Sequence, residues 1–148
     1  MRISIENGKL YDPSKKLDSK QDLFIADGKI VAFKKKPEGF KSDIKIDARD
    51  KIIIPGLVDL CARLREPGFE KKGTFKSELN AANSNGITSI CMPPDTAPIV
   101  DTPAVVEFIH QRARETNRAN IYPLGALTQE LKGEQLAEMY LLKEAGCV

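Results

Sequence analysis

A short apolar run, Leu57–Leu60, is followed at once by side chains that could do chemistry. Cys61 could bind a soft metal ion as a thiolate, and the guanidinium groups of Arg63 and Arg65 could each hold a carboxylate through paired N–H donors. The run lies between two Pro-Gly breaks, a pattern typical of a buried parallel strand. Barrel enzymes keep their active sites just past the carboxyl ends of such strands. We therefore expect any active site of this chain to begin at Cys61.

The same residues are poorly suited to a metal centre. A metal-activated hydrolase needs several ligands that converge on one ion and leave a position open for water. The chain holds a single histidine, His110, in the middle of a predicted helix, and we interpret it as a half-buried surface residue. Arg63, two residues on, is expected to point to the same face of the strand as Cys61, and its protonated guanidinium repels a cation and offers no lone pair. Cys61 is therefore interpreted as a small packing residue, with a metal-ligand role as the alternative.

The residues around this strand resemble those of the dihydroorotases, in the amidohydrolase superfamily. The match consists of Pro-Gly-Leu-Val-Asp-Leu at residues 55–60 and Leu-Arg-Glu-Pro-Gly at residues 64–68. In that family a His-x-His stands between the two pieces and ligates a catalytic zinc ion. Here Cys61 and Arg63 occupy the two histidine positions. The resemblance thus implies a dihydroorotase frame with degenerate metal positions, so we expect no zinc, no other cofactor and no catalytic residue.

Arg65 is the strongest candidate for a retained function. The arginine of the family's Leu-Arg-Glu-Pro motif holds the substrate carboxylate, and the resemblance implies a weak or vestigial form of this role for Arg65. The alternative is a salt bridge from Arg65 to Glu66 or Asp59 that only fixes the loop.

A second loop, Met92–Pro98, also resembles a family motif and departs from it. The family has Met-Pro-Asn-Thr-x-Pro, whose asparagine helps to bind substrate, whereas Pro94 and Asp95 stand there in this chain, with one extra residue. Asp95 would repel an anionic substrate such as dihydroorotate, so we expect at most a vestigial binding role for it. With both motifs altered, the chain resembles the non-catalytic dihydroorotase-like proteins that accompany aspartate carbamoyltransferase in some bacteria.

These departures predict a metal-free pseudoenzyme of pyrimidine biosynthesis, a scaffold or partner subunit with aspartate carbamoyltransferase as the implied partner. One alternative is an active zinc-dependent cyclic-amide hydrolase, in which Cys61 and residues beyond 148 complete an unusual ligand set. Another is a protein that binds small anions through Arg63 and Arg65 without turnover.

From residue 57 onward, predicted strands alternate with predicted helices, which indicates βαβ units and a parallel sheet. The strands are expected at residues 57–60, 87–92 and 121–126, and the helices after Thr74, after Thr102 and at residues 133–145. The last helix is expected to have an apolar face made of Leu136, Met139 and Tyr140. The resemblance implies that residues 55–148 are the first three βα units of a (β/α)8 barrel of the TIM type.

Residues 1–54 alternate short apolar strands with turns. Two-residue hairpin turns are predicted at Asn7-Gly8 and Asp27-Gly28, and the strands beside them indicate a small antiparallel β unit. The resemblance implies that these residues are the N-terminal portion of a β-sandwich, which strands from the C-terminus complete in the family.

The composition is that of an ordinary globular protein, with 41% apolar and 30% charged residues. A net charge of +2 favours neither nucleic acid nor a membrane surface as a partner, and no apolar run is long enough to span a membrane. The N-terminal residues lack the uncharged segment of a signal peptide. Cys61, Cys91 and Cys147 are odd in number and far apart, so we expect free thiols in a reducing cytoplasm.

A complete barrel of this type needs about 250 residues, and the chain has 148. We therefore interpret it as a fragment. Three βα units would form an open sheet, whose edge strands carry unpaired backbone N–H and C=O groups that can pair with another chain. We expect self-association through these open sheet edges.

Overall fold

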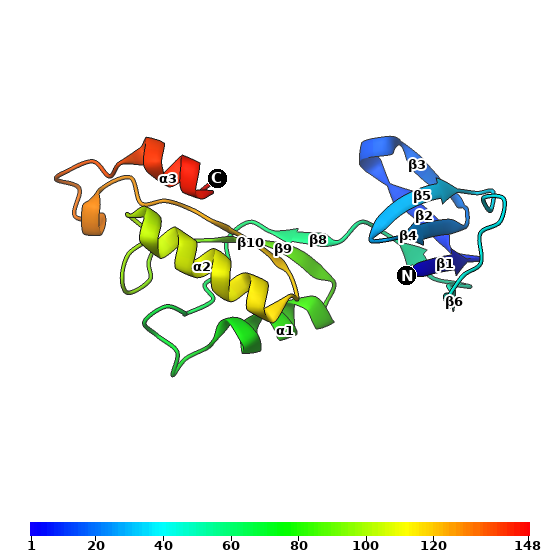
Figure 1. The fold of residues 1–148 in the computed structure, drawn as a ribbon, viewed down its shortest axis with the longest axis horizontal. Coiled ribbons are helices and arrows are strands. Elements are labelled where there is room, and N and C mark those ends of the chain that lie inside the picture. Colours follow the sequence, from blue (N-terminus) through cyan, green and yellow to red (C-terminus); the bar gives the residue numbers. More distant parts are fainter. The chain divides into compact units, whose positions relative to one another are not determined.

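The computed structural model describes residues 1–148, which form two compact units, Met1–Pro55 and Gly56–Val148. Figure 1 shows strands in the first unit, and helices that follow strands in the second. None of the helices is long and apolar enough to cross a membrane.

The N-terminal unit contains two small sheets. The first has four strands in the order β5-β4-β1-β6, and the second has three in the order β3-β2-β7. The strands are β1 Arg2–Glu6, β2 Lys9–Asp12, β3 Leu17–Lys20, β4 Leu23–Ala26, β5 Lys29–Phe33, β6 Ile44–Asp47 and β7 Ile52–Ile53, with the 3-10 turn η1 at Pro13–Lys15. In the core of the unit, the buried rings of Phe24 and Phe40 pack edge to face, with centroids 5.5 Å apart.

Strand pairing in this unit is mixed, whereas the sequence suggested an antiparallel unit. β4 and β5 form the hairpin predicted at Asp27-Gly28, but β6 runs parallel to β1, and β7 runs parallel to β2. The hairpin predicted at Asn7-Gly8 is wrong, because β1 and β2 lie in different sheets.

Asn7 and Gly8 instead carry the chain from one sheet to the other. The side chain of Asn7 donates to Asp47 Oδ1 at 2.9 Å, and its backbone N–H donates to Asp22 Oδ1 at 3.0 Å. A Cβ on Gly8 would lie 2.5 Å from Ile53 Cδ1, so only glycine permits this close approach. Contacts with residues far along the chain thus override the local hairpin signal.

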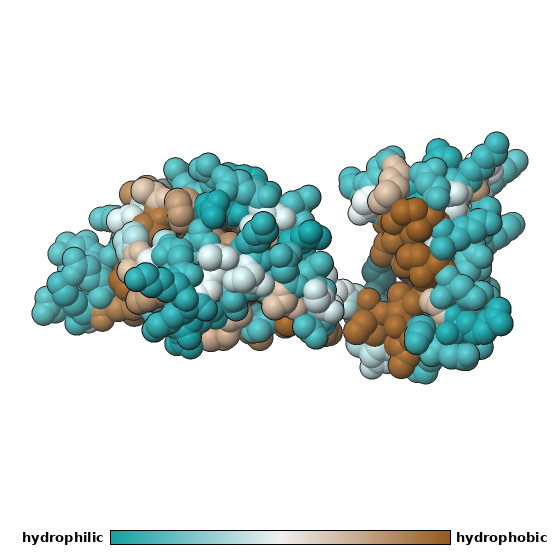
Figure 2. All heavy atoms as spheres, turned by 90° about the horizontal axis from the view of Figure 1, so that it is seen from below, coloured by the Kyte–Doolittle hydropathy of each residue, from teal (hydrophilic) through white to brown (hydrophobic).

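The sheets of the N-terminal unit bury only part of their apolar surface. Figure 2 shows broad hydrophobic areas on the surface of this unit. The exposed large apolar side chains of its strands and of the segment after β7 are Tyr11, Ile30, Val31, Ile44, Ile46, Ile52 and Ile54.

The C-terminal unit is built on a three-stranded parallel sheet in the order β10-β9-β8, as the alternation of strands and helices predicts. Its elements are β8 Leu57–Asp59, α1 Phe75–Ser84, β9 Ile87–Met92, α2 Pro103–Thr116, β10 Asn120–Pro123, the 3-10 turn η2 Gln129–Leu131 and α3 Met139–Ala145.

The first two helices begin where their capping residues predict. Thr74 Oγ1 accepts the N–H of Ser77 at 3.1 Å and Ser77 Oγ accepts the N–H of Thr74 at 2.9 Å, which makes a capping box at the start of α1. Gly86, with a φ of +83°, follows the end of α1. α2 begins at Pro103 after Thr102, although the Thr102 side chain makes no cap hydrogen bond.

α1 and α2 pack with the sheet to form the core of this unit. Its most deeply buried side chains include Phe75 and Leu79 of α1, Ile90 and Met92 of β9, Val106 and Ile109 of α2, and Val100 of the loop between β9 and α2. Because Met92 is anchored in this core, the loop that follows β9 starts from a fixed point.

The last part of the chain differs from its prediction. β10 ends at Pro123, not at residue 126, and α3 begins at Met139, not at residue 133. Residues 133–138 are not helical because they bond to the segment before them: Gln129 N–H donates to Gln135 O at 2.8 Å, and Ala137 N–H donates to Leu127 O at 3.0 Å. The predicted apolar face is also wrong, since Leu136, Met139 and Tyr140 are all exposed, and Leu142 is the buried residue of α3.

Candidate functional site

The candidate site lies at the carboxyl ends of β8 and β9, in the β8–α1 loop (residues 60–74) and the β9–α2 loop (residues 93–102). β8 ends at Asp59, whose Oδ1 accepts the N–H of Cys61 at 2.9 Å. Cys61 and Arg63 therefore lie in the loop, and the expectation that they share one face of a strand is wrong. The loop stays beside β9, because Ala62 N–H donates to Cys91 O at 3.1 Å.

An ion pair joins the two loops. Arg63 Nε lies 2.6 Å from Asp95 Oδ2, and both side chains are partly exposed. The hydrogen bond and the negative charge of Asp95 raise the pKa of the Arg63 guanidinium, which keeps it charged. Arg63 and Asp95 are positions at which the two sequence motifs depart from the dihydroorotase pattern. The structure thus brings the two departures into contact.

The side chains present do not fit a zinc site of the dihydroorotase type. Cys61 is an exposed free thiol, so its interpretation as a small packing residue is wrong. No three His, Cys, Asp or Glu side chains of the chain lie close enough together to hold a metal ion. Arg63, at the other degenerate position, offers only N–H donors, one of which, Nε–H, donates to Asp95. The other two cysteines, Cys91 and Cys147, are free as well.

Arg65 is exposed and its guanidinium makes no ion pair, so the suggested salt bridge to Glu66 or Asp59 is not formed. Its backbone has a positive φ of 70°, and its carbonyl accepts the N–H of Phe69 at 2.8 Å. The recess between Arg63, Arg65 and Asp95 has a volume of about 10 Å³. That is room for about one water molecule, far below the ~300–1,000 Å³ of ordinary ligand pockets.

Glu66 is a site residue whose role the sequence did not reveal. Its carboxylate is buried, with Oε2 accepting the N–H of Phe75 at 2.7 Å and Oε1 accepting Arg112 Nε at 2.8 Å. Glu66 thereby ties the β8–α1 loop to the first residue of α1 and to the middle of α2. The available signal was an acidic residue between Arg65 and Pro67 in the motif, but the sequence does not identify a partner 46 residues away.

The two loops also interlock through their backbones. Ala97 N–H donates to Pro67 O at 3.1 Å, and Gly68 has a φ of +96°. A Cβ on Gly68 would lie 2.3 Å from Ala97 O, so the loops touch without room for a side chain there. The two loops that carry Arg63, Arg65 and Asp95 are therefore packed closely against each other.

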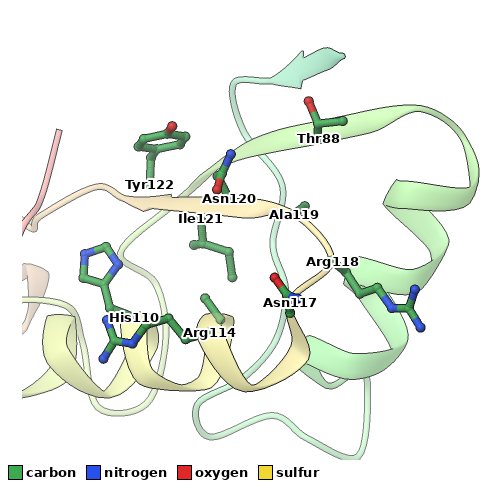
Figure 3. Close-up of a pocket in the computed structure, with 10 residues that line it drawn as sticks. Thr88, His110, Arg114, Asn117, Arg118, Ala119, Asn120, Ile121 and Tyr122 are labelled. Carbon is green, nitrogen blue, oxygen red and sulfur yellow. The ribbon is translucent and has the colours of Figure 1, made fainter. Parts of the chain in front are cut away.

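A larger hollow of the unit lies elsewhere, beside α2 and β10, and has a volume of about 400 Å³ (Figure 3). His110 lines it and is half-buried, as the sequence suggested, with Nε2 2.7 Å from the position that a Cβ on Gly146 would take. In Figure 3 the side chains of His110 and Arg118 point in different directions, so these two side chains do not converge on one ligand position.

Solved structures define the class of fold. The chain is similar to an L-hydantoinase (dihydropyrimidinase) from Arthrobacter aurescens, with a TM-score of 0.83 and 22% identity over 98% of this chain and 31% of that chain. It is also similar to a dihydropyrimidinase from Brevibacillus agri, with a TM-score of 0.65 and 24% identity over 85% of this chain and 27% of that one. The fold is therefore a mixed α/β arrangement that matches about a third of a hydantoinase-type amidohydrolase.

The sequence comparisons define the family. Residues 50–148 match the family described as dihydro-orotase-like, so the chain belongs to the dihydroorotase-like family of the amidohydrolase superfamily. A "Dihydroorotase-like protein" of Pseudomonas aeruginosa is 49% identical over 148 residues, and a "Dihydroorotase" of Pelobacter propionicus is 41% identical over 151 residues. The chain spans about a third of these relatives, 35% of each. The resemblance seen in the motifs is confirmed.

Proposed function

We propose that this chain is part of a metal-free, non-catalytic dihydroorotase-like protein that serves as a scaffold or partner subunit in pyrimidine biosynthesis. The observation that carries the proposal is the ion pair between Arg63 and Asp95. Arg63 puts a fixed positive charge at a degenerate metal position, and the carboxylate of Asp95 is paired with that charge. A hydrolase of this class needs a metal-bound water as nucleophile near neutral pH, and the paired guanidinium of Arg63 offers no lone pair to a metal at its position.

We further propose that residues 55–148 are the first three βα units of a (β/α)8 barrel and that residues 1–54 are a portion of a β-sandwich. The parallel order of β8, β9 and β10 and the helices between them support the barrel assignment. The likeness to the hydantoinase over 98% of the chain supports both parts. In such a barrel, the Arg63–Asp95 pair would lie at the end that normally carries the active site.

Aspartate carbamoyltransferase is the proposed partner, in the cytoplasm, and this proposal rests on the family resemblance. Self-association through the edges of the β10-β9-β8 sheet is the second proposed contact. Its support is the exposure of Leu57, Val58 and Leu60 on and just after the edge strand β8, at 47%, 59% and 72%. Co-expression with an aspartate carbamoyltransferase, followed by sizing, tests the first contact, and two separate peaks at micromolar concentration would count against it.

Metal content is the direct test of the proposed function. Protein purified without chelator should contain far less than one zinc per chain by elemental analysis. About one zinc per chain, lost in Cys61→Ser and kept in the control Cys91→Ser, would overturn the proposal. The double variant Cys61→His/Arg63→His should still show no metal-dependent dihydroorotase turnover, because no further ligands lie together in this chain.

An active zinc-dependent cyclic-amide hydrolase is the second candidate. Relatives named "Dihydroorotase" are 39% and 41% identical to the chain, and the exposed thiol of Cys61 stands just after β8. This candidate requires that further ligands come from outside residues 1–148. Metal-dependent hydrolysis of dihydroorotate by the unmodified protein, above a mock preparation, would select it over the scaffold.

A further inference from the structure

A groove with a volume of about 280 Å³ lies between α1 and α2. Its walls are side chains of these two helices and of one residue just after α2, and no sheet edge takes part. In a (β/α)8 barrel, consecutive helices are neighbours in the outer ring, so further βα units would leave both walls in place. The volume is close to the lower end of the range for small-molecule sites, about 300 Å³. The lining residues are Lys76, Asn80, Arg112, Glu115, Thr116 and Arg118.

Two of the three cations in the groove have no partner within the chain. Arg112 is held between two carboxylates, with Nε 2.8 Å from Glu66 Oε1 and Nη1 bonded to Glu115, and these contacts raise the pKa of its guanidinium. Lys76 on α1 and Arg118 just after α2 are exposed and make no ion pair. The groove thus has one free positive charge on each of its two walls.

The uncharged side chains of the groove add hydrogen-bonding groups. Asn80 lies one turn after Lys76 on α1, so the two side chains share one face of the helix, and the half-buried amide of Asn80 makes no hydrogen bond to another side chain. The hydroxyl of Thr116 donates to Ala113 O at 2.9 Å, which leaves its oxygen to accept. Donors for an anion therefore line the α1 wall, and the oxygens of Thr116 and Glu115 on α2 can accept hydroxyl groups.

We propose that this groove binds a small phosphate ester that carries free hydroxyl groups. Lys76 and Arg118 hold the doubly charged phosphate, because both residue types bind phosphate through charge-assisted hydrogen bonds, and the amide of Asn80 donates a further bond. Glu115 and Thr116 accept from the hydroxyl groups of the ester. A ligand with a single negative charge would leave one of the two cations unmatched. The site is independent of the strand-end loops and of the proposed function.

Calorimetric titration of the full chain with glycerol 3-phosphate at constant ionic strength tests the site. We expect saturable binding that is tighter than that of inorganic phosphate, and no binding of glycerol, which lacks the charge. Lys76→Gln and Arg118→Gln should each weaken the binding of glycerol 3-phosphate about tenfold, since each removes a hydrogen bond between charged groups. The controls Lys71→Gln and Arg114→Gln remove the same charge at exposed positions outside the groove and should bind like the wild type.

Three results would overturn the proposal. The first is the absence of saturable binding at millimolar glycerol 3-phosphate. The second is an equal loss of affinity in the control variants and in the groove variants, which would indicate a diffuse attraction of anions by the surface. The third is equal affinity for glycerol 3-phosphate and inorganic phosphate, which would exclude a role for the ester hydroxyl groups. All four substituted side chains are exposed, so the variants should fold, and unchanged melting temperatures without ligand would check this.

Discussion

Arg63 Nε lies 2.6 Å from Asp95 Oδ2, and this contact connects the loop after β8 to the loop after β9. Neither side chain has another ion-pair partner. A cation and an anion have thus replaced two groups that, in the dihydroorotase pattern, serve metal and substrate. The predictions below concern the packing that supports this pair and the one arginine beside it that remains free.

Replacing Glu66 with glutamine should destabilise the C-terminal unit by about 2–3 kcal/mol, the range for losing hydrogen bonds to a buried charged group. The variant leaves Arg112 and the N–H of Phe75 without their charged acceptor. Chemical denaturation is the measurement, with Glu107→Gln on the exposed side of α2 as the control. Equal midpoints for the two variants would show that Glu66 does not hold the loop.

Gly68→Ala should lower the stability of the C-terminal unit more than Gly133→Ala does. Both glycines have a positive φ, so both substitutions carry a backbone cost of about 1–2 kcal/mol. Only Gly68 faces a neighbour, since a Cβ there would lie 2.3 Å from Ala97 O, whereas a Cβ on Gly133 would have no neighbouring atom within 4 Å. The difference, about 1–3 kcal/mol for overpacking, should appear as a lower melting temperature. A smaller loss for Gly68→Ala than for Gly133→Ala would contradict the interlocked loops.

Thr74→Ala should cost about 1 kcal/mol, the usual value for an N-cap side chain, because it removes the acceptor for Ser77 N–H. Thr102→Ala is the matched control, since the Thr102 side chain makes no cap hydrogen bond. Denaturant midpoints of the two variants give the comparison. Equal losses in both would mean that the capping box does not stabilise α1.

Dihydroorotate should not raise the melting temperature of the chain, even at millimolar concentration. Arg65 is free to meet an anion, but the recess beside it holds about 10 Å³, and Asp95 adds a negative charge nearby. A ligand that bound the folded chain would stabilise it by mass action. A rise that disappears in Arg65→Ala and persists in Arg114→Ala would favour the small-anion binder over the scaffold.

The sequence predicted those features whose causes are local. The capping residues Thr74 and Gly86 act on their own neighbours, and the apolar run Ile87–Met92 needs only burial, so these elements appear where expected. The hairpin predicted at Asn7-Gly8 is wrong because these two residues make their contacts with residues 22, 47 and 53. The helix predicted for residues 133–138 is wrong for the same reason, since the backbone hydrogen bonds of these residues are with residues 127 and 129.

The site divides in the same way. The motif spacing placed Cys61, Arg63, Arg65 and Asp95 at neighbouring strand ends, but it did not show that Arg63 and Asp95 would pair. That contact spans 32 residues, and the contact between Glu66 and Arg112 spans 46. Pairings of this kind depend on how helices and strands pack, and the order of residue types along the chain does not predict them.

The Arg63–Asp95 pair also constrains how this sequence can change. A substitution of Arg63 alone leaves the Asp95 carboxylate without its cation, and a substitution of Asp95 alone leaves an unmatched guanidinium beside Cys61. Each single step loses an interaction before any metal ligand is gained. Replacing Arg63 with a metal ligand therefore also removes the contact with Asp95 in the other loop, so the effects of substitutions at these two positions are expected to be coupled.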